Sequence, residues 1–220
     1  MILEIDNVEL YFKEKRILNG IYLKAETGKT TGILGGNGCG KSCLLKIIFG
    51  TLNPKYKLIR INSKPILKPL YQTKLVSYLP QHHFIPNSLK TKTAFKLFNV
   101  DWIDFINSFP SFALFENLKF NRLSGGERRV VEVYLILKSS SKIVLLDEPF
   151  SHIAPLYIEK ITSLIEIENH QKAIIITDHM YQHIVGASNS IYLIKNGCSK
   201  YIENLKELED YKYVSMGSID

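Results

Sequence analysis

The sequence predicts an α/β fold with a parallel core sheet, an antiparallel β rim and one small inserted helical lobe. Three observations support this prediction. In the second half of the chain, apolar strands alternate with helical patterns, as in a parallel sheet covered on both faces. The first segments alternate apolar and polar residues, as antiparallel strands do. Between them, residues 82–122 are rich in Phe, with helical spacing interrupted by Pro86 and Pro110.

The elements follow in order along the chain. The early antiparallel strands are expected over residues 2–5, 8–11 and 21–24, and the segment TTGILG, residues 30–35, predicts a buried strand that leads into the helix CLLKIIFG. Further strands are expected at KLIRI and LVSYL. After the lobe we expect a helix over 125–138, a strand over 142–147, a helix over 155–168, a strand over 172–177, a helix over 179–185 and a hairpin over 190–202. Pro155 suits the first turn of its helix, and Asn196-Gly197 suits the hairpin turn.

Composition limits the class of protein. The chain has 220 residues, of which 45% are hydrophobic, so residues 1–220 are expected to form a single domain with the lobe inserted in it. Its apolar runs are too short to span a bilayer, so a membrane connection would require a partner. The first residues lack a signal-peptide pattern, and three Cys give no disulfide framework, which favours the cytoplasm. The net charge of +7 comes from scattered Lys residues, typical of a solvated surface, and no nucleic-acid partner is expected.

The stretch GGNGCGKS matches the pattern G-x-x-x-x-G-K-[ST] between a strand and a helix. Glycines let phosphate oxygens approach backbone N–H groups closely, and the start of the helix reinforces this anion site. The Lys would reach the β- and γ-phosphates of a nucleotide, and the Ser hydroxyl would face Mg²⁺. The pattern therefore predicts a P-loop NTPase core that binds ATP and Mg²⁺. Its residues are Gly35, Gly36, Asn37, Gly38, Cys39, Gly40, Lys41 and Ser42.

The segment KIVLLDEP places two carboxylates at the end of an apolar strand, where ligands bind in open α/β sheets. Asp147 is expected to hold Mg²⁺. Glu148 is expected to polarise the water that attacks the γ-phosphate. The alternative is that Asp-Glu-Pro only ends the strand in a solvated turn.

The segment LSGGE, residues 123–127, resembles the signature motif of ATP-binding-cassette (ABC) ATPases. The resemblance covers nearly the whole chain. It implies that Ser124, Gly125 and Gly126 bind the γ-phosphate of a neighbouring subunit, in a head-to-tail dimer with two ATP molecules between the chains. In isolation, Ser124 could instead be a plain helix N-cap.

The same resemblance assigns three further residues. Gln81 in YLPQ resembles the Q-loop glutamine, a ligand of metal and water, and His179 in TDH resembles the switch histidine that contacts the γ-phosphate. Phe12 occupies the place of the aromatic that stacks on adenine, with Tyr11 as the neighbouring candidate. Either aromatic could also be an ordinary strand residue.

The sequence departs from the family pattern in three places. The helical lobe is short, and the strand region YKLIRINSKPI lacks the glycines that commonly flank it. In EPFSHIAP, which resembles a D-loop, the usual Asp falls at Ala154, although Ser151 or His152 could replace its contact. The forms EPF…P and TDH resemble the cassettes of lipopolysaccharide export and branched-chain amino-acid import.

The resemblance implies the ATP-hydrolysing subunit of an ABC transporter, acting as a homodimer on the inner face of the membrane through an integral membrane partner. A groove near Gln81 would receive that partner, lined by aromatics among Phe84, Phe95, Phe98 and Trp102 unless these lie in the core. The alternatives are a soluble ABC ATPase, such as the iron–sulfur assembly type, and a slow ATP-dependent switch.

Overall fold

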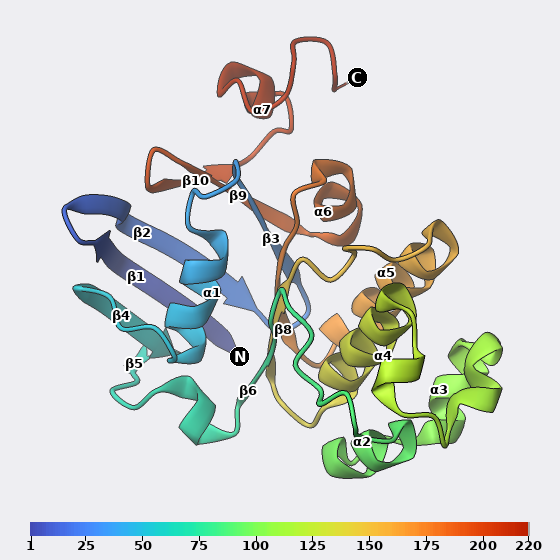
Figure 1. The fold of residues 1–220 in the computed structure, drawn as a ribbon. Helices are drawn as coiled ribbons and strands as arrows, with labels where there is room; N and C mark the ends of the chain where they lie inside the picture. The colour runs from blue at the N-terminus through green and yellow to red at the C-terminus, as the bar shows by residue number, and fades with distance from the viewer. Residues whose placement is uncertain (220) are drawn as a thin grey trace.

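The structure is a computed structural model that describes residues 1–219, with two β-sheets and helices between and beside them (Figure 1). The strands are β1 (Ile2–Phe12), β2 (Lys15–Glu26), β3 (Thr30–Leu34), β4 (Tyr56–Ile61), β5 (Lys64–Pro65), β6 (Val76–Leu79), β7 (Ile143–Asp147), β8 (Ala173–Thr177), β9 (Ser190–Lys195) and β10 (Cys198–Ile202). The α-helices are α1 (Lys41–Phe49), α2 (Thr91–Phe98), α3 (Trp102–Ser108), α4 (Gly125–Lys138), α5 (Pro155–Asn169), α6 (Tyr181–Ala187) and α7 (Glu207–Asp210). Short 3-10 helices are η1 (Leu70–Thr73), η2 (Pro110–Phe115) and η3 (Phe120–Arg122).

The larger sheet has the strand order β10-β9-β3-β8-β7-β6, and its strands are parallel except for β10, which pairs antiparallel with β9. The smaller sheet, in the order β2-β1-β4-β5, is antiparallel throughout. The predicted fold class, a parallel core with an antiparallel rim and added helices, is confirmed. Among residues 1–219, no helix combines the length and the apolar character needed to cross a membrane.

Every residue of β3, β7 and β8 is buried, because both faces of the parallel sheet are covered. Alternate residues of β7 show the two faces: Ile143 and Leu145 pack with α1 and the antiparallel sheet, while Val144 and Leu146 pack with α4, α5 and the lobe. Helix α1 therefore lies between the two sheets. This arrangement fixes its first residues at the carboxyl ends of β3, β7 and β8.

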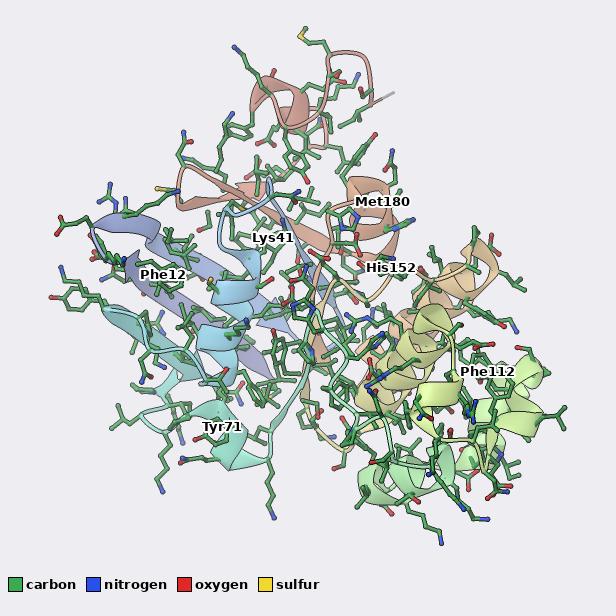
Figure 2. The ribbon with its side chains drawn as sticks, in the orientation of Figure 1. Phe12, Lys41, Tyr71, Phe112, His152 and Met180 are labelled. Atoms are coloured by element: carbon green, nitrogen blue, oxygen red, sulfur yellow. The ribbon has the colours of Figure 1, made fainter. Side chains whose placement is uncertain are left out.

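The lobe lies beside α4, and Figure 2 shows Phe112 at this end of the molecule, far from Phe12 and Lys41. Its short helices enclose an aromatic cluster, in which the ring of Phe105 lies 4.8 Å from that of Tyr134 on α4. Phe95 is 2% exposed and belongs to this cluster, so the prediction that it could line a docking groove is wrong. The rings of Phe84, Phe98 and Trp102 are half-buried and pack against the same cluster. The core interpretation is therefore confirmed for Phe95, and a groove lined by the other three aromatics stays a prediction.

The antiparallel strands are longer than the alternation indicated. Residues 2–5 and 8–11 form one strand, β1, with a register shift between Ile5 and Val8 where Asn7 adopts φ 49°. Strand β2 starts at Lys15 and passes through Gly20, which has φ 61°. The Asn19-Gly20 pair resembles a turn signal in the sequence, but here it lies in an irregular part of a strand.

Candidate active site

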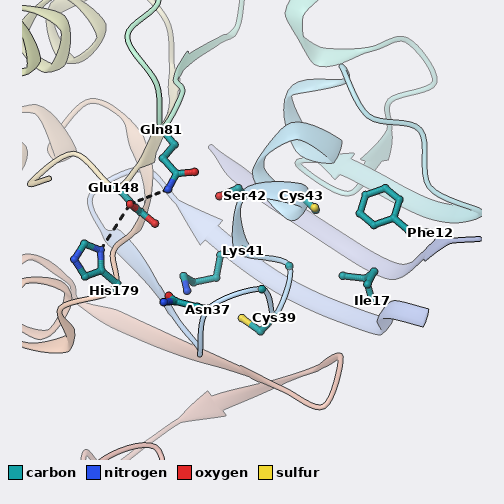
Figure 3. Close-up of a pocket in the computed structure, with 12 residues that line it drawn as sticks. Phe12, Ile17, Asn37, Cys39, Lys41, Ser42, Cys43, Gln81, Glu148 and His179 are labelled. Carbon is teal, nitrogen blue, oxygen red and sulfur yellow. Dashed lines mark hydrogen bonds and ion pairs between the residues drawn. The ribbon is translucent and has the colours of Figure 1, made fainter. Parts of the chain in front are cut away.

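A cavity of about 580 Å³ opens where α1 begins, beside the carboxyl ends of the central strands. Figure 3 shows its lining from one side, with the phosphate-loop residues on α1 facing Gln81, Glu148 and His179. These side chains come from segments that are far apart in the sequence, and the parallel sheet brings them to one edge. The lining residues are Phe12, Ile17, Asn37, Gly38, Cys39, Gly40, Lys41, Ser42, Cys43, Gln81, Glu148 and His179.

The start of α1 is built to receive an anion. No side chain caps this helix, its first turn carries no acidic residue, and Gly40 at the N-cap has φ 105°. A Cβ at Gly40 would lie 2.6 Å from Leu18 Cδ2, so both the backbone conformation and the close packing require glycine. The amides of the first turn therefore face the cavity without side-chain competition.

Lys41 lies in the same loop with 7% of its surface exposed. Its ammonium donates to the carbonyl oxygen of Gly35 at 2.6 Å and to that of Gly36 at 3.4 Å. Both acceptors are neutral, and a buried charge is stable in proteins when it is paired with an opposite charge. The loop and its lysine thus fit a phosphate group.

Asp147 is 1% exposed at the end of β7, and three hydroxyl groups surround its carboxylate. Oδ1 accepts from Ser42 Oγ and from Thr177 Oγ1, each at 2.9 Å, while Oδ2 accepts from the Tyr78 hydroxyl at 3.0 Å. Burial, followed by the negative charge of Asp147, raises the pKa of Tyr78, so this phenol stays a donor. A buried carboxylate bonded to a serine hydroxyl is a set of oxygen donors that suits Mg²⁺.

Glu148 follows in a constrained conformation, with φ 52°, which is costly for a residue other than glycine. Its backbone is held on both sides: the amide donates to the Thr177 carbonyl, and the carbonyl accepts from Arg129, each at 2.9 Å. Its Oε2 accepts from Gln81 Nε2 at 3.1 Å and from Ser151 Oγ at 3.3 Å. His179 Nδ1 lies 3.7 Å from the same oxygen. In this conformation Glu148 lines the cavity.

Sequence reasoning did not identify Arg129, Tyr78 and Thr177 as residues of this region. Arg129 on α4 is 2% exposed and donates to the carbonyl of Pro80, at 2.7 Å, as well as to those of Asp147 and Glu148. Burial lowers the pKa of its guanidinium, although Glu132 and Asp147 act in the opposite direction. Arg129 therefore ties the residue before Gln81 to the end of β7. The only local signal was its position in the helix that follows LSGG, which does not reveal this contact.

The two aromatic candidates for stacking on adenine differ in their position relative to the cavity. Phe12 is 50% exposed and lines the cavity, with Ile17 beside it. Tyr11 is not among the lining residues, and its ring lies under the Lys55 ammonium, 5.4 Å from the ring centroid. Two lining residues, Ile17 and Cys43, were not singled out from the sequence. Burial raises the pKa of the Cys43 thiol, so it adds a neutral surface.

Comparison with protein families matches residues 18–151 to the family described as ABC transporter. The chain belongs to the ABC transporter family. It is similar to the probable branched-chain amino acid transport ATP-binding protein LivF of Archaeoglobus fulgidus, 29% identical over 95% of this chain and 96% of the relative. It is also similar to the lipopolysaccharide export system ATP-binding protein LptB of Haemophilus influenzae, 27% identical over 98% of this chain and 97% of the relative. The resemblance to these two kinds of cassette is thereby confirmed.

A solved structure described as the ATP binding subunit of an ABC transporter has the same fold. Its TM-score is 0.79, it covers 97% of this chain and 94% of its own, and the sequences are 19% identical. At that identity the likeness shows the fold alone.

In this ABC chain the signature residues Ser124, Gly125 and Gly126 lie outside the cavity lining. Ser124 caps α4: its Oγ accepts from the Glu127 amide at 3.3 Å, and its own amide donates to Glu127 Oε2 at 2.7 Å. The N-cap interpretation of Ser124 is therefore correct in the single chain. Gly126 packs tightly on the next loop, because a Cβ there would lie 2.5 Å from the His152 carbonyl oxygen.

The loop that resembles a D-loop runs from Ser151 to Ala154, next to these glycines. Ala154 is exposed at the N-cap of α5, and no side chain caps that helix. His152 is exposed with φ 62°. The Ser151 hydroxyl donates to the Glu148 carboxylate of its own chain. To contact another subunit, Ser151 would have to give up this hydrogen bond.

Proposed function

We propose that this chain is the ATP-binding and ATP-hydrolysing subunit of an ABC transporter. The observation that supports it is that three groups meet at one cavity: an uncapped helix start with the buried Lys41, the lining residue Ser42 with its hydrogen bond to the buried Asp147, and Glu148 with Gln81 and His179. Each group suits one requirement of phosphoryl transfer, namely phosphate binding, metal binding and activation of water.

ATP would lie with its adenine on Phe12 and its phosphates on the amides from Gly36 to Ser42, with Lys41 beside the β- and γ-phosphates. Ser42, Asp147 and Gln81 would hold Mg²⁺, directly or through water. This ion neutralises the phosphate oxygens when it is bound. The oxygen donors of these residues fit such an ion.

Hydrolysis requires a base and a group that follows the transferred phosphate. Glu148 would accept a proton from the water that attacks the γ-phosphorus, while the bond from that phosphorus to the bridging oxygen of ADP breaks. Gln81 and His179, which lie against the Glu148 carboxylate, would orient the water and contact the γ-phosphate. The proton then leaves Glu148 to solvent with the release of phosphate.

Two further parts of the proposal concern partners. The signature residues lie outside the cavity of their own chain, which supports a head-to-tail homodimer with ATP at each of two sites. Closing of that dimer on ATP would drive an integral membrane partner, which would place the chain at the inner face of the cell membrane. The slow ATP-dependent switch gains support from one observation, since an alanine at position 154 offers no acceptor to a second subunit.

Purification of the tagged chain from native membranes, with ATP turnover measured on the purified complex, tests the proposal. We expect a co-purifying integral membrane protein and release of phosphate that requires Mg²⁺. Turnover without any membrane partner would favour a soluble ABC ATPase. ATP binding with negligible turnover would favour the switch.

A further inference from the structure

Asp147 is held by side chains from the strands on both sides of β7. Three hydroxyl groups within residues 1–219 donate to its carboxylate, and two of them, those of Tyr78 and Thr177, belong to the neighbouring strands β6 and β8. The third, Ser42, belongs to the phosphate loop and donates to Oδ1. Because the donors approach both oxygens, the carboxylate has no freedom to rotate about its side-chain bonds without losing a hydrogen bond.

The sheet register explains why these residue types are needed. Thr177 is the direct partner of Asp147 in the β7–β8 ladder, so a short hydroxyl side chain reaches Oδ1. Tyr78 pairs with Leu145, two residues earlier on β7 and on the same face as Asp147. Two residues along a strand span about 6.6 Å. A tyrosine can bridge that offset, whereas serine or threonine at position 78 is too short and phenylalanine has no donor.

The ring of Tyr78 is itself fixed by packing. It lies 5.3 Å, centroid to centroid, from Phe49 at the end of α1 and belongs to the hydrophobic cluster between the sheets. Helix α1 carries Ser42 at its other end. The packing that positions α1 therefore also orients the Tyr78 hydroxyl toward Asp147.

We propose that Tyr78 and Thr177 are positioning residues that orient the Asp147 carboxylate for a divalent cation bound with the nucleotide. The Ser42 proton is already donated to Oδ1 at 2.9 Å, which leaves the lone pairs of Ser42 Oγ to face the cation. This inference rests on the proposed function, since it assumes that Ser42 and Asp147 hold the cation. Tyr78 and Thr177 donate to Asp147, and neither residue lines the cavity, so both act on the cation through the carboxylate that is hydrogen-bonded to the lining residue Ser42.

The test measures metal binding without turnover. Mn²⁺ is titrated into the whole chain in the presence of a non-hydrolysable ATP analogue, and free Mn²⁺ is followed by electron paramagnetic resonance. Partners of metal ligands typically contribute about 10- to 100-fold to metal affinity. We expect Tyr78→Phe and Thr177→Val each to weaken Mn²⁺ binding by about 10-fold. Affinity for the analogue in EDTA should stay unchanged in both.

Two controls separate positioning from general damage. Thr177→Ser keeps the hydroxyl and should retain the wild-type Mn²⁺ affinity. Tyr192→Phe removes another buried tyrosine hydroxyl of the same sheet, one that accepts from the Lys24 amide and makes no contact with Asp147. It should leave Mn²⁺ affinity unchanged. Thermal melting of each variant reports whether it is folded, and Thr177→Val with Thr177→Ser tests the proposal even if Tyr78→Phe is unfolded.

The outcomes are distinct. Unchanged Mn²⁺ affinity in folded Tyr78→Phe and Thr177→Val would overturn the inference, as would an equal loss in Thr177→Ser and Thr177→Val. An equal loss of affinity for the analogue in EDTA would also overturn it, because the effect would then not be on the metal. If the wild-type chain binds no Mn²⁺ with the analogue, it is the proposed function that fails.

Discussion

Two helices of this molecule begin with glycines, and their amides have different partners. At the start of α1 no side chain within residues 1–219 caps the helix, and the buried Lys41 ammonium donates to the neutral carbonyls of Gly35 and Gly36. At the start of α4 a capping box of Ser124 and Glu127 satisfies donors within the chain. The first is an anion site ready within one chain. The second is stable by itself in water, so a phosphate from another subunit must compete with an internal cap.

This difference indicates how a cassette can remain single until ATP arrives. The cavity at α1 contains its binding groups within one chain. The start of α4, by contrast, is exposed, and its capping box already pairs its amides within the chain. In the proposed dimer, association would depend on the charge that ATP brings to α1.

Glu148→Gln should remove the base and leave the binding groups intact. We expect phosphate release to fall on the order of 100- to 10,000-fold. Because hydrolysis would reopen the dimer, the variant should accumulate as an ATP-bound dimer, detected by gel filtration with light scattering. Glu166→Gln, at an exposed glutamate of α5, is the control and should behave as wild type. A Glu148→Gln chain that stays monomeric with saturating ATP and Mg²⁺ would contradict the role given to the signature end.

Lys41→Ala should weaken ATP binding by removing the buried ammonium. Hydrogen bonds to charged groups contribute about 1.5–3 kcal/mol, which corresponds to roughly 10- to 100-fold in affinity. Equilibrium binding of ATP with Mg²⁺ measures it. Lys46→Ala changes an exposed lysine of the same helix and should leave the affinity nearly unchanged. Equal affinities in wild type and Lys41→Ala would show that this loop is not the phosphate site.

Phe12→Ala should raise the KM for ATP, since the ring lines the cavity. Aromatic stacking contributes about 0.5–1.5 kcal/mol, or roughly 2- to 10-fold. Tyr11→Ala is the matched control, because Tyr11 neighbours Phe12 but lies under Lys55 outside the lining. A larger rise of the KM for ATP in Tyr11→Ala than in Phe12→Ala would instead assign Tyr11 as the aromatic that stacks on adenine.

Ala154→Asp should raise kcat several-fold by restoring an acceptor that reaches the opposing subunit, since a misplaced contact can cost up to about 100-fold in rate. Asp at the uncapped start of α5 should also stabilise the fold by about 1 kcal/mol. Ala154→Asn caps the helix equally well and keeps an acceptor without the charge, so it should raise the melting temperature, and its kcat shows whether the contact requires a carboxylate. If kcat is unchanged or lower in Ala154→Asp, the missing-contact idea fails, and Ser151 or His152 has taken over that contact.

The extent of sequence-based prediction differs between the same two regions. Both limits of α4 were predicted, and the structure explains why its start is a local signal: Ser124 and Glu127 form a capping box that needs no partner from elsewhere. The length of β2 was not predicted, and the sequence left open whether Phe95 lies in the core or lines a groove. An irregular strand around Gly20 hides its alternation, and a phenylalanine on a short helix gives no sign of which neighbour covers it.

Local sequence patterns were sufficient to predict most elements of the α/β fold, the phosphate loop and the acidic strand end at Asp147 and Glu148, because each depends on residues that are adjacent in the chain. Only the tertiary structure decided that Tyr78, Thr177 and Arg129 meet at Asp147 and Glu148. Hydrophobic period reveals which face of a strand is buried, but not which strand lies beside it. The order β3-β8-β7-β6, with α1 packed on one face of the sheet and α4 on the other, involves contacts between residues that are far apart in the chain.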